Sequence, residues 1–239
     1  MTVDAVIFDK DGTLFDFAAT WEAWAAAFLE RLSRGDPDRA ERLGASVGFS
    51  YRERRFARDS IVIAGTPAEI AAALSPSLPG FDAGQLIALL NEEAARAPQR
   101  EAVPLLPFLS DLKARGLRLG VATNDAEQPA RAHLRAAGVE QCFDFIAGFD
   151  SGHGAKPEPG PLLAFAEAMA IAPARIVMVG DSLHDLRAGR AAGMRTVGVL
   201  TGLAGHETLS PMADVVLPDI GHLPRWLLRV APTGVSVRT

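Results

Sequence analysis

The chain has 239 residues, of which 49% are hydrophobic, so it can build one large domain or two smaller ones around a substantial core. Its 24 basic and 29 acidic residues give a formal net charge of −5, which argues against a broad surface for nucleic acid or anionic membranes. Cys142 is the single cysteine, and neither a signal-peptide pattern nor a membrane-length apolar run is visible, so we expect a cytoplasmic protein, monomeric or homodimeric, without an intrachain disulfide.

The first predicted element is a strand at residues 3–8, which is mostly apolar, as expected for a central parallel strand buried on both faces. Residues 16–98 then form a long stretch rich in alanine, leucine and charged residues. A first helix is predicted by the helical spacing of Trp21, Trp24, Phe28 and Leu32. Residues 68–74 and 85–97 predict further helices. The strand candidate in this stretch, residues 60–64, is ambiguous. We therefore expect a helical insertion after the first strand.

Further apolar runs predict strands at residues 117–122, 143–147, 176–179, 196–200 and 214–217. Between them, apolar spacing ended by a glycine predicts helices at residues 105–115, 127–137 and 186–192. Strands that alternate with helices predict an α/β fold with a doubly wound parallel sheet. We expect residues 1–15 and 99–230 to form this core, with residues 231–239 as a loose tail.

Four polar segments follow predicted strands, directly or after a short loop. They are Asp9-Lys10-Asp11-Gly12-Thr13-Leu14, Thr123-Asn124, Lys156-Pro157 and Gly180-Asp181-Ser182-Leu183-His184-Asp185. In an open parallel sheet, ligands bind beyond the carboxyl ends of the strands. Each segment alone also fits a helix cap or an exposed loop, but the set together predicts one phosphoryl-transfer site.

The first segment supplies the expected reacting groups. Asp9, directly after the strand, is suited to attack phosphorus and form an acyl-phosphate. Asp11 is suited to protonate the leaving oxygen and then to deprotonate water. Gly12 permits a tight turn that, together with Thr13, is the expected phosphate-binding turn.

The charges of these groups call for a cation. Two carboxylates about 4 Å apart repel by about 4 kcal/mol at an effective dielectric constant near 20. Mg²⁺ prefers such oxygen ligands, so Asp9, Asp181 and the Asp11 carbonyl are the expected metal ligands, and Asp185 is expected to support the metal or to orient Lys156. The Lys156 ammonium is expected to stabilise the transferring group. We also expect the Thr123 hydroxyl and the Asn124 amide to bind phosphate.

With these motifs the chain resembles the haloacid dehalogenase superfamily, and in particular its phosphoglycolate-phosphatase-like branch. Asp9, Asp11, Gly12 and Thr13 match its Asp-x-Asp-Gly-Thr pattern, and the later motifs are matched by Thr123, Lys156, Gly180, Asp181 and Asp185. The resemblance implies a Rossmann-like core, dependence on Mg²⁺, an aspartyl-phosphate intermediate and a mobile cap formed by residues 16–98. Lys10 departs from the apolar residue often found at its position, and we expect it to point towards the cap or solvent.

The superfamily also contains rival activities. Its dehalogenases lack the second aspartate, so Asp11 argues against them, and its phosphonate hydrolases need a cap lysine that residues 16–98 do not contain. Phosphosugar mutases share the same motifs and remain an alternative, as does a non-catalytic module that binds phosphate or metal. The expected function is hydrolysis of a small phosphomonoester, such as phosphoglycolate or a sugar phosphate.

Substrate selection is expected from the insertion. Arg52 and Arg55, in a cluster with Arg54 and Arg58, are candidates for binding a substrate carboxylate. A solvated face with acidic residues interleaved is the alternative, and it is the more ordinary outcome for such a charge run.

Overall fold

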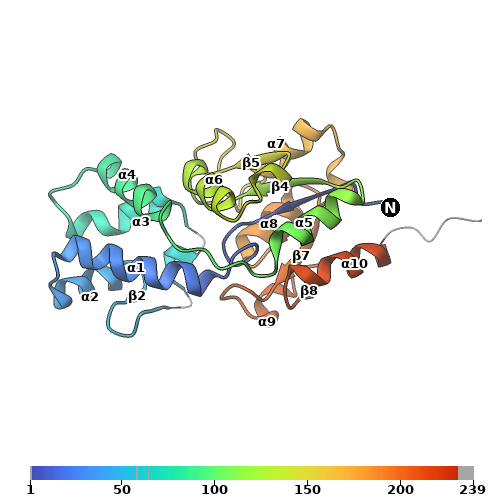
Figure 1. Ribbon diagram of the computed structural model, residues 1–239. Helices are drawn as coiled ribbons and strands as arrows, with labels where there is room; N and C mark the ends of the chain where they lie inside the picture. The colour runs from blue at the N-terminus through green and yellow to red at the C-terminus, as the bar shows by residue number, and fades with distance from the viewer. Residues whose placement is uncertain (1, 58, 64, 231–239) are drawn as a thin grey trace, which may run out of the picture.

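The computed structural model describes residues 2–57, 59–63 and 65–230, and it is built around a six-stranded sheet (Figure 1). The strand order is β5-β4-β1-β6-β7-β8, and all neighbouring strands are parallel. The strands are β1 (Ala5–Phe8), β4 (Arg118–Ala122), β5 (Phe145–Ala147), β6 (Ile176–Gly180), β7 (Arg195–Val199) and β8 (Val215–Leu217). All six predicted strands are confirmed, with ends that differ by one or two residues. The predicted tail, residues 231–239, lies outside the described residues.

Helices cover both faces of this sheet. They are α5 (Leu105–Ala114), α6 (Glu127–Ala136), α7 (Gly160–Met169), α8 (Leu183–Ala191), α9 (His206–Leu209) and α10 (Leu223–Val230). Val6 and Phe8 of β1 pack with α5, α6 and α10, whereas Ala5 and Ile7 pack with α7 and α8. Because successive side chains of a strand point to opposite faces, this division confirms the doubly wound architecture. No described helix has the length and apolar character needed to cross a membrane.

Helix α8 begins three residues before the predicted start at residue 186. Ser182 caps it, because its side chain accepts a hydrogen bond from the Asp185 N–H while the Asp185 carboxylate accepts one from the Ser182 N–H. This reciprocal capping box stabilises the first turn. The apolar spacing alone could not locate that start, because the residues of the first turn are mostly polar.

The insertion forms a second hydrophobic cluster beside the sheet, drawn from blue to blue-green in Figure 1. Its helices are α1 (Phe17–Ser33), α2 (Pro37–Ser46), α3 (Pro67–Leu74) and α4 (Ala83–Ala94). The four apolar residues of the predicted first helix, Trp21, Trp24, Phe28 and Leu32, are all buried in this cluster. The helical spacing of their sequence therefore predicted the buried face of α1.

The insertion also contains two short strands, although its long elements are all helical. β2 (Phe49–Ser50) pairs with β3 (Arg55–Phe56) in an antiparallel hairpin that no sequence pattern predicted. The ambiguous residues 60–64 contain a 3₁₀ helix, Ile61–Ile63, rather than a strand, and residue 64 lies outside the described part of the chain. The Ser60 hydroxyl accepts from the Val62 N–H and donates to the Val47 carbonyl, which favours the turn over an extended chain.

The position of β1 determines where the functional residues gather. Phe8, its last residue, is in register with Val121 of β4 on one side and Val179 of β6 on the other. The chain adds β4 and β5 to one side of β1 and then β6, β7 and β8 to the other side. Such a reversal leaves a crevice at the carboxyl ends of the central strands, where ligands bind in open α/β sheets.

Candidate active site

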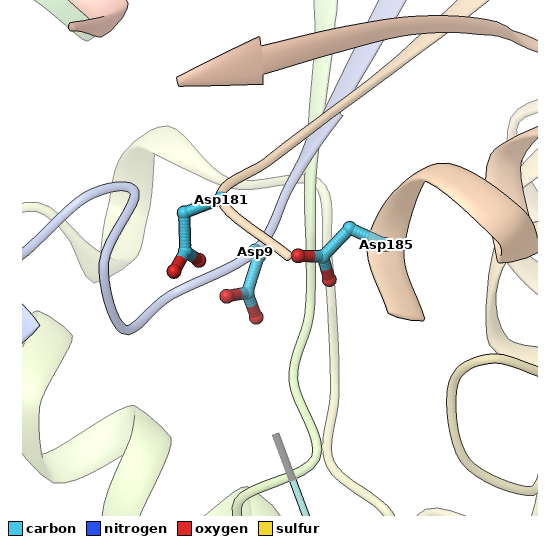
Figure 2. A group of neighbouring side chains, drawn as sticks. All are labelled: Asp9, Asp181 and Asp185. Atoms are coloured by element: carbon cyan, nitrogen blue, oxygen red, sulfur yellow. The ribbon is translucent and has the colours of Figure 1, made fainter. Parts of the chain in front are cut away.

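Three buried carboxylates meet in this crevice (Figure 2). Asp9 follows β1, Asp181 follows β6, and Asp185 lies in the first turn of α8. One carboxylate oxygen from each lies within 4.8 Å of the others. Segments more than 170 residues apart in the sequence therefore build one acidic cluster, as the motif order predicted.

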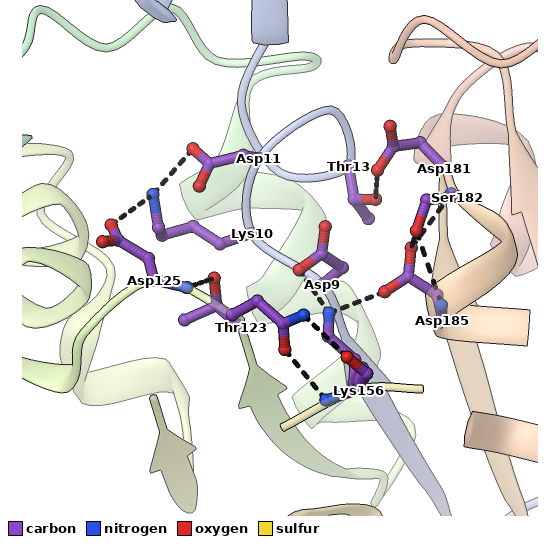
Figure 3. A network of polar contacts seen from close by, with 11 residues as sticks. Asp9, Lys10, Asp11, Thr13, Thr123, Asp125, Lys156, Asp181, Ser182 and Asp185 are labelled. Atoms are coloured by element: carbon purple, nitrogen blue, oxygen red, sulfur yellow. Dashed lines mark hydrogen bonds and ion pairs between the residues drawn. The ribbon is translucent and has the colours of Figure 1, made fainter. Parts of the chain in front are cut away.

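The Lys156 ammonium joins two of these carboxylates. Its Nζ lies 2.6 Å from Asp9 Oδ1 and 2.6 Å from Asp185 Oδ1 (Figure 3). Lys156 lies in the loop between β5 and α7, and the Asn124 side chain holds that loop. The Asn124 amide donates to the Lys156 carbonyl (2.8 Å), and its oxygen accepts from the Lys156 N–H (2.9 Å). We expected the Asn124 amide to face phosphate, whereas in the structure it bonds the backbone that presents Lys156.

Negative charge exceeds positive charge in the cluster. Burial raises the pKa of Asp9, Lys156 lowers it, and Asp185 and Asp11 raise it again, so that it reaches about 7. Burial, together with the charges of Asp185 and Asp9, also raises the pKa of Asp181 well above its ordinary value. A cation bound among these oxygens would offset both effects and favour the ionised carboxylates.

The surroundings of Asp181 fit a small cation. A Cβ atom on Gly12 would lie 2.4 Å from Asp181 Oδ2, and one on Gly202 would lie 1.7 Å from it, so no side chain is tolerated at either position. The Thr13 hydroxyl lies 3.5 Å from Asp181 Oδ1, which directs it to this carboxylate. The atoms available to ligate a metal here are all carboxylate oxygens, and oxygen is the ligand type that Mg²⁺ prefers. The cluster is therefore of a kind that can hold a divalent metal ion.

Lys10 was expected to point towards the insertion or solvent. It is fully buried and faces the insertion. Its Nζ lies over the ring of Trp21 in α1, 5.4 Å from the centroid. It also lies 2.6 Å from Asp11 Oδ1, 3.1 Å from His133 Nδ1 and 3.5 Å from Asp125 Oδ2. Figure 3 shows Lys10 between the two carboxylates.

The contacts of Lys10 determine the tautomer of His133. An ammonium group can only donate, so His133 Nδ1 accepts, and the proton on Nε2 is donated to the Ala94 carbonyl at 2.7 Å. Burial and the Lys10 charge lower the pKa of His133 to about 4, so it is neutral near pH 7. Burial alone lowers the pKa of Lys10, but Asp11 and Asp125 outweigh it and raise that pKa. A charged Lys10 thus links the Asp11 loop to α6 and to the end of α4.

A cleft lies between the sheet edge and the insertion. From the core, the predicted residues that line it are Asp9, Asp11, Thr123, Asn124, Lys156 and Asp185. From the insertion come Trp21, Trp24 and Asn91, which our sequence-based reasoning did not assign to a site. The helical spacing of the two tryptophans indicated core positions, and both are indeed mostly buried while still lining the cleft.

The predicted arginines lie elsewhere. Arg52 is exposed and pairs with Asp38, also exposed, at 2.6 Å, while Arg55 is exposed on β3. Neither lines the cleft between sheet and insertion. Arg58 of the same cluster lies outside the described residues. The arrangement of Arg52 and Arg55 agrees with the alternative of a solvated charged face.

Comparison with known proteins identifies the family. A family model for haloacid dehalogenase-like hydrolases matches residues 3–193. The chain belongs to this family. The predicted resemblance is confirmed, and so is the assignment as a hydrolase. Membership in the haloacid dehalogenase-like hydrolases also accounts for the four motifs that meet at the sheet edge.

Individual relatives of this hydrolase cover most of its length. A phosphoglycolate phosphatase of Shigella boydii is 29% identical over 91% of this chain and 88% of its own, and a pyrophosphatase of Bacillus pumilus is 29% identical over 87% and 88%. A solved structure from Haemophilus somnus, described as a predicted phosphoglycolate phosphatase, has a TM-score of 0.72 at 19% identity over 95% of this chain and 98% of its own. A β-phosphoglucomutase from Clostridium difficile has a TM-score of 0.64 at 18% identity, over 95% and 98%. The last two likenesses concern the fold.

Proposed function

We propose that this hydrolase is a Mg²⁺-dependent phosphatase that cleaves a small phosphomonoester through an aspartyl-phosphate on Asp9. The observation that carries the proposal is the pairing of the Asp9 carboxylate with the Lys156 ammonium at 2.6 Å, at the base of a cleft and beside two further buried carboxylates. This combination offers a nucleophile, a cation for the transferring group and oxygen ligands for a metal ion. The names of the relatives, phosphoglycolate phosphatase and pyrophosphatase, support phosphate chemistry.

Each side chain has a distinct role in the proposed reaction. An Asp9 oxygen attacks phosphorus, and the bond from phosphorus to the ester oxygen breaks while Asp11 gives that oxygen a proton. Water then attacks the acyl-phosphate, Asp11 takes its proton, and phosphate leaves with Asp9 regenerated. Lys156 stabilises charge on the transferring oxygens throughout. Mg²⁺, held by Asp9 and Asp181, would reduce the repulsion between the carboxylates and the phosphate dianion.

The insertion is proposed as the cap of this active site. Its side chains line the cleft opposite Asp9 and Asp11, so closure over a bound ester would exclude water from the reaction. We propose residues 16–98 as the cap and residues 1–15 and 99–230 as the catalytic core. The separate hydrophobic cluster of the insertion supports this division.

Metal-dependent phosphate release tests the proposal. The purified protein is expected to release phosphate from p-nitrophenyl phosphate with Mg²⁺ and to lose this activity with a chelator. Asp181→Asn should raise the Mg²⁺ concentration needed for half-maximal rate about 10-fold or more, because it removes a ligand charge. Asp111→Asn, an exposed residue of α5 paired with Arg115, is the matched control and should behave like the parent. Release that persists under chelation contradicts the metal requirement, and turnover that requires a sugar bisphosphate identifies a mutase instead.

A further inference from the structure

The half of the cleft formed by the insertion carries no charged side chain among the described residues. Its lining is apolar or aromatic, with residues such as Phe17, Ile63, Ile70 and Leu90, apart from the amide of Asn91 and the two indole groups. In the proposed phosphatase this half faces the leaving group, because Asp9 and Lys156 occupy the other half. Its composition therefore indicates what kind of leaving group the enzyme accepts.

The nearby positive charges are already engaged. Lys156 contacts Asp9 and Asp185, and Lys10 contacts Asp11, His133 and Asp125. The core residue His184 also lines the cleft. The carboxylates of Asp11 and Asp125 also line the cleft at the boundary with the insertion. A carboxylate or second phosphate on the leaving group would meet these two carboxylates, which share the single Lys10 ammonium, and would find no cationic partner from the insertion. Burying an unpaired charge in this way is strongly unfavourable.

Three buried polar atoms on the lining residues of the insertion have no hydrogen-bond partner in the described part of the chain. They are the indole nitrogens of Trp21 and Trp24 and the side-chain oxygen of Asn91. Each tryptophan is only 7% exposed, and a buried indole N–H is usually hydrogen-bonded. These lining residues therefore hold two donors and one acceptor that a ligand with polar atoms on an apolar body would satisfy.

The aromatic lining of the cleft agrees with such a ligand. The rings of Trp21 and Trp24 lie edge to face, with centroids 5.0 Å apart. Aromatic walls of this kind favour contact with a planar or apolar group.

We propose that the preferred substrate is the phosphate monoester of an uncharged alcohol with an apolar or aromatic body and at least one hydrogen-bond acceptor. This inference rests on the proposed phosphatase function and goes beyond it by naming the leaving-group class. It differs from the substrates in the names of the relatives, since phosphoglycolate carries a carboxylate and pyrophosphate carries a second phosphate.

A matched pair of aryl phosphates tests this selection. 4-Carbamoylphenyl phosphate and 4-carboxyphenyl phosphate have nearly the same shape, and one is uncharged where the other carries a carboxylate. We expect kcat/KM with Mg²⁺ to be about 10–100-fold higher for the carbamoyl ester. Phosphoglycolate should likewise be slower than its uncharged analogue, 2-hydroxyethyl phosphate. Equal values within a pair, or a preference for the charged member, overturn the proposal.

A variant tests the role of the indole N–H. Trp24→Phe keeps an aromatic ring and removes the donor, so the ratio of kcat/KM for 4-carbamoylphenyl phosphate to that for phenyl phosphate should fall about 5–30-fold. Trp226→Phe, in α10 and packed against the core, is the matched control and should leave that ratio unchanged. An unchanged ratio in Trp24→Phe would show that the Trp24 indole N–H does not bind the leaving group. Failure to hydrolyse any of these esters would instead contradict the proposed phosphatase function.

Discussion

Replacing Asp9 with asparagine is expected to lower kcat for any phosphate ester by a factor of about 10⁴ or more. Asparagine has nearly the same shape, but its amide is a poor nucleophile and cannot form the acyl-phosphate. The fold should survive, because removing one of three clustered carboxylates lowers the repulsion that raises the pKa of Asp181. Steady-state phosphate release at saturating substrate and Mg²⁺ measures the effect.

Asp111→Asn serves as the control for this variant, since Asp111 is an exposed aspartate of α5. It should keep the parent rate, and both variants should show the parent melting temperature within a few degrees. An Asp9→Asn protein that is folded and keeps kcat within about tenfold of the parent would show that another group attacks phosphorus.

The second large effect is expected on stability, in Lys10→Met. Methionine removes the ammonium that Asp11, Asp125 and His133 share in a buried site. Removing one partner of a buried ion pair leaves an uncompensated charge and costs about 3–5 kcal/mol. For a chain of this size, that corresponds to a fall in melting temperature of roughly 6–20 °C. Thermal unfolding followed by circular dichroism measures this shift.

Lys113→Met is the matched control for Lys10→Met. Lys113 lies at the surface of the core and pairs with Asp144 at 2.9 Å, and Asp144 keeps its bond to the Leu119 N–H without it. A partly exposed pair of this kind contributes about 0–1 kcal/mol. If both methionine variants shift the melting temperature equally, the buried network around Lys10 does not contribute as the structure implies.

The catalytic side of the site was predictable because its residues follow strands. The apolar run before Asp9 and the one before Asp181 each predict a parallel strand, and parallel strands end at one edge of a sheet. Proximity of residues far apart in the sequence then follows from topology. The same logic predicted the place of Thr123 after β4.

The environment of Lys10 could not be predicted in this way. Its partner His133 lies on α6, and His133 in turn bonds the Ala94 carbonyl at the end of α4. These contacts depend on how the insertion packs against the core, and sequence periodicity carries no information on that packing. An isolated lysine in a loop is usually solvated, so the sequence left the insertion and solvent as alternatives for Lys10, and the structure shows the insertion.

The arginine cluster illustrates a similar gap. Arg52 and Arg55 were candidates for binding a substrate carboxylate, with a solvated charged face as the more ordinary outcome. A hairpin that no pattern signalled places both arginines away from the cleft. Helix α7 was also missed, because Pro159 and Pro161 at its start give a loop-like pattern. Proline at the first positions of a helix is nevertheless well tolerated.

Chemical capture of the phosphoenzyme shows directly whether Asp9 is the residue that attacks phosphorus. Enzyme mixed with excess substrate and Mg²⁺ is quenched in acid and reduced with borohydride, which converts an aspartyl-phosphate to homoserine, and peptides are then read by mass spectrometry. We predict homoserine at position 9 in the parent protein and at no other aspartate. Rapid phosphate release without modification of Asp9, or modification at another residue, would show that Asp9 is not the nucleophile.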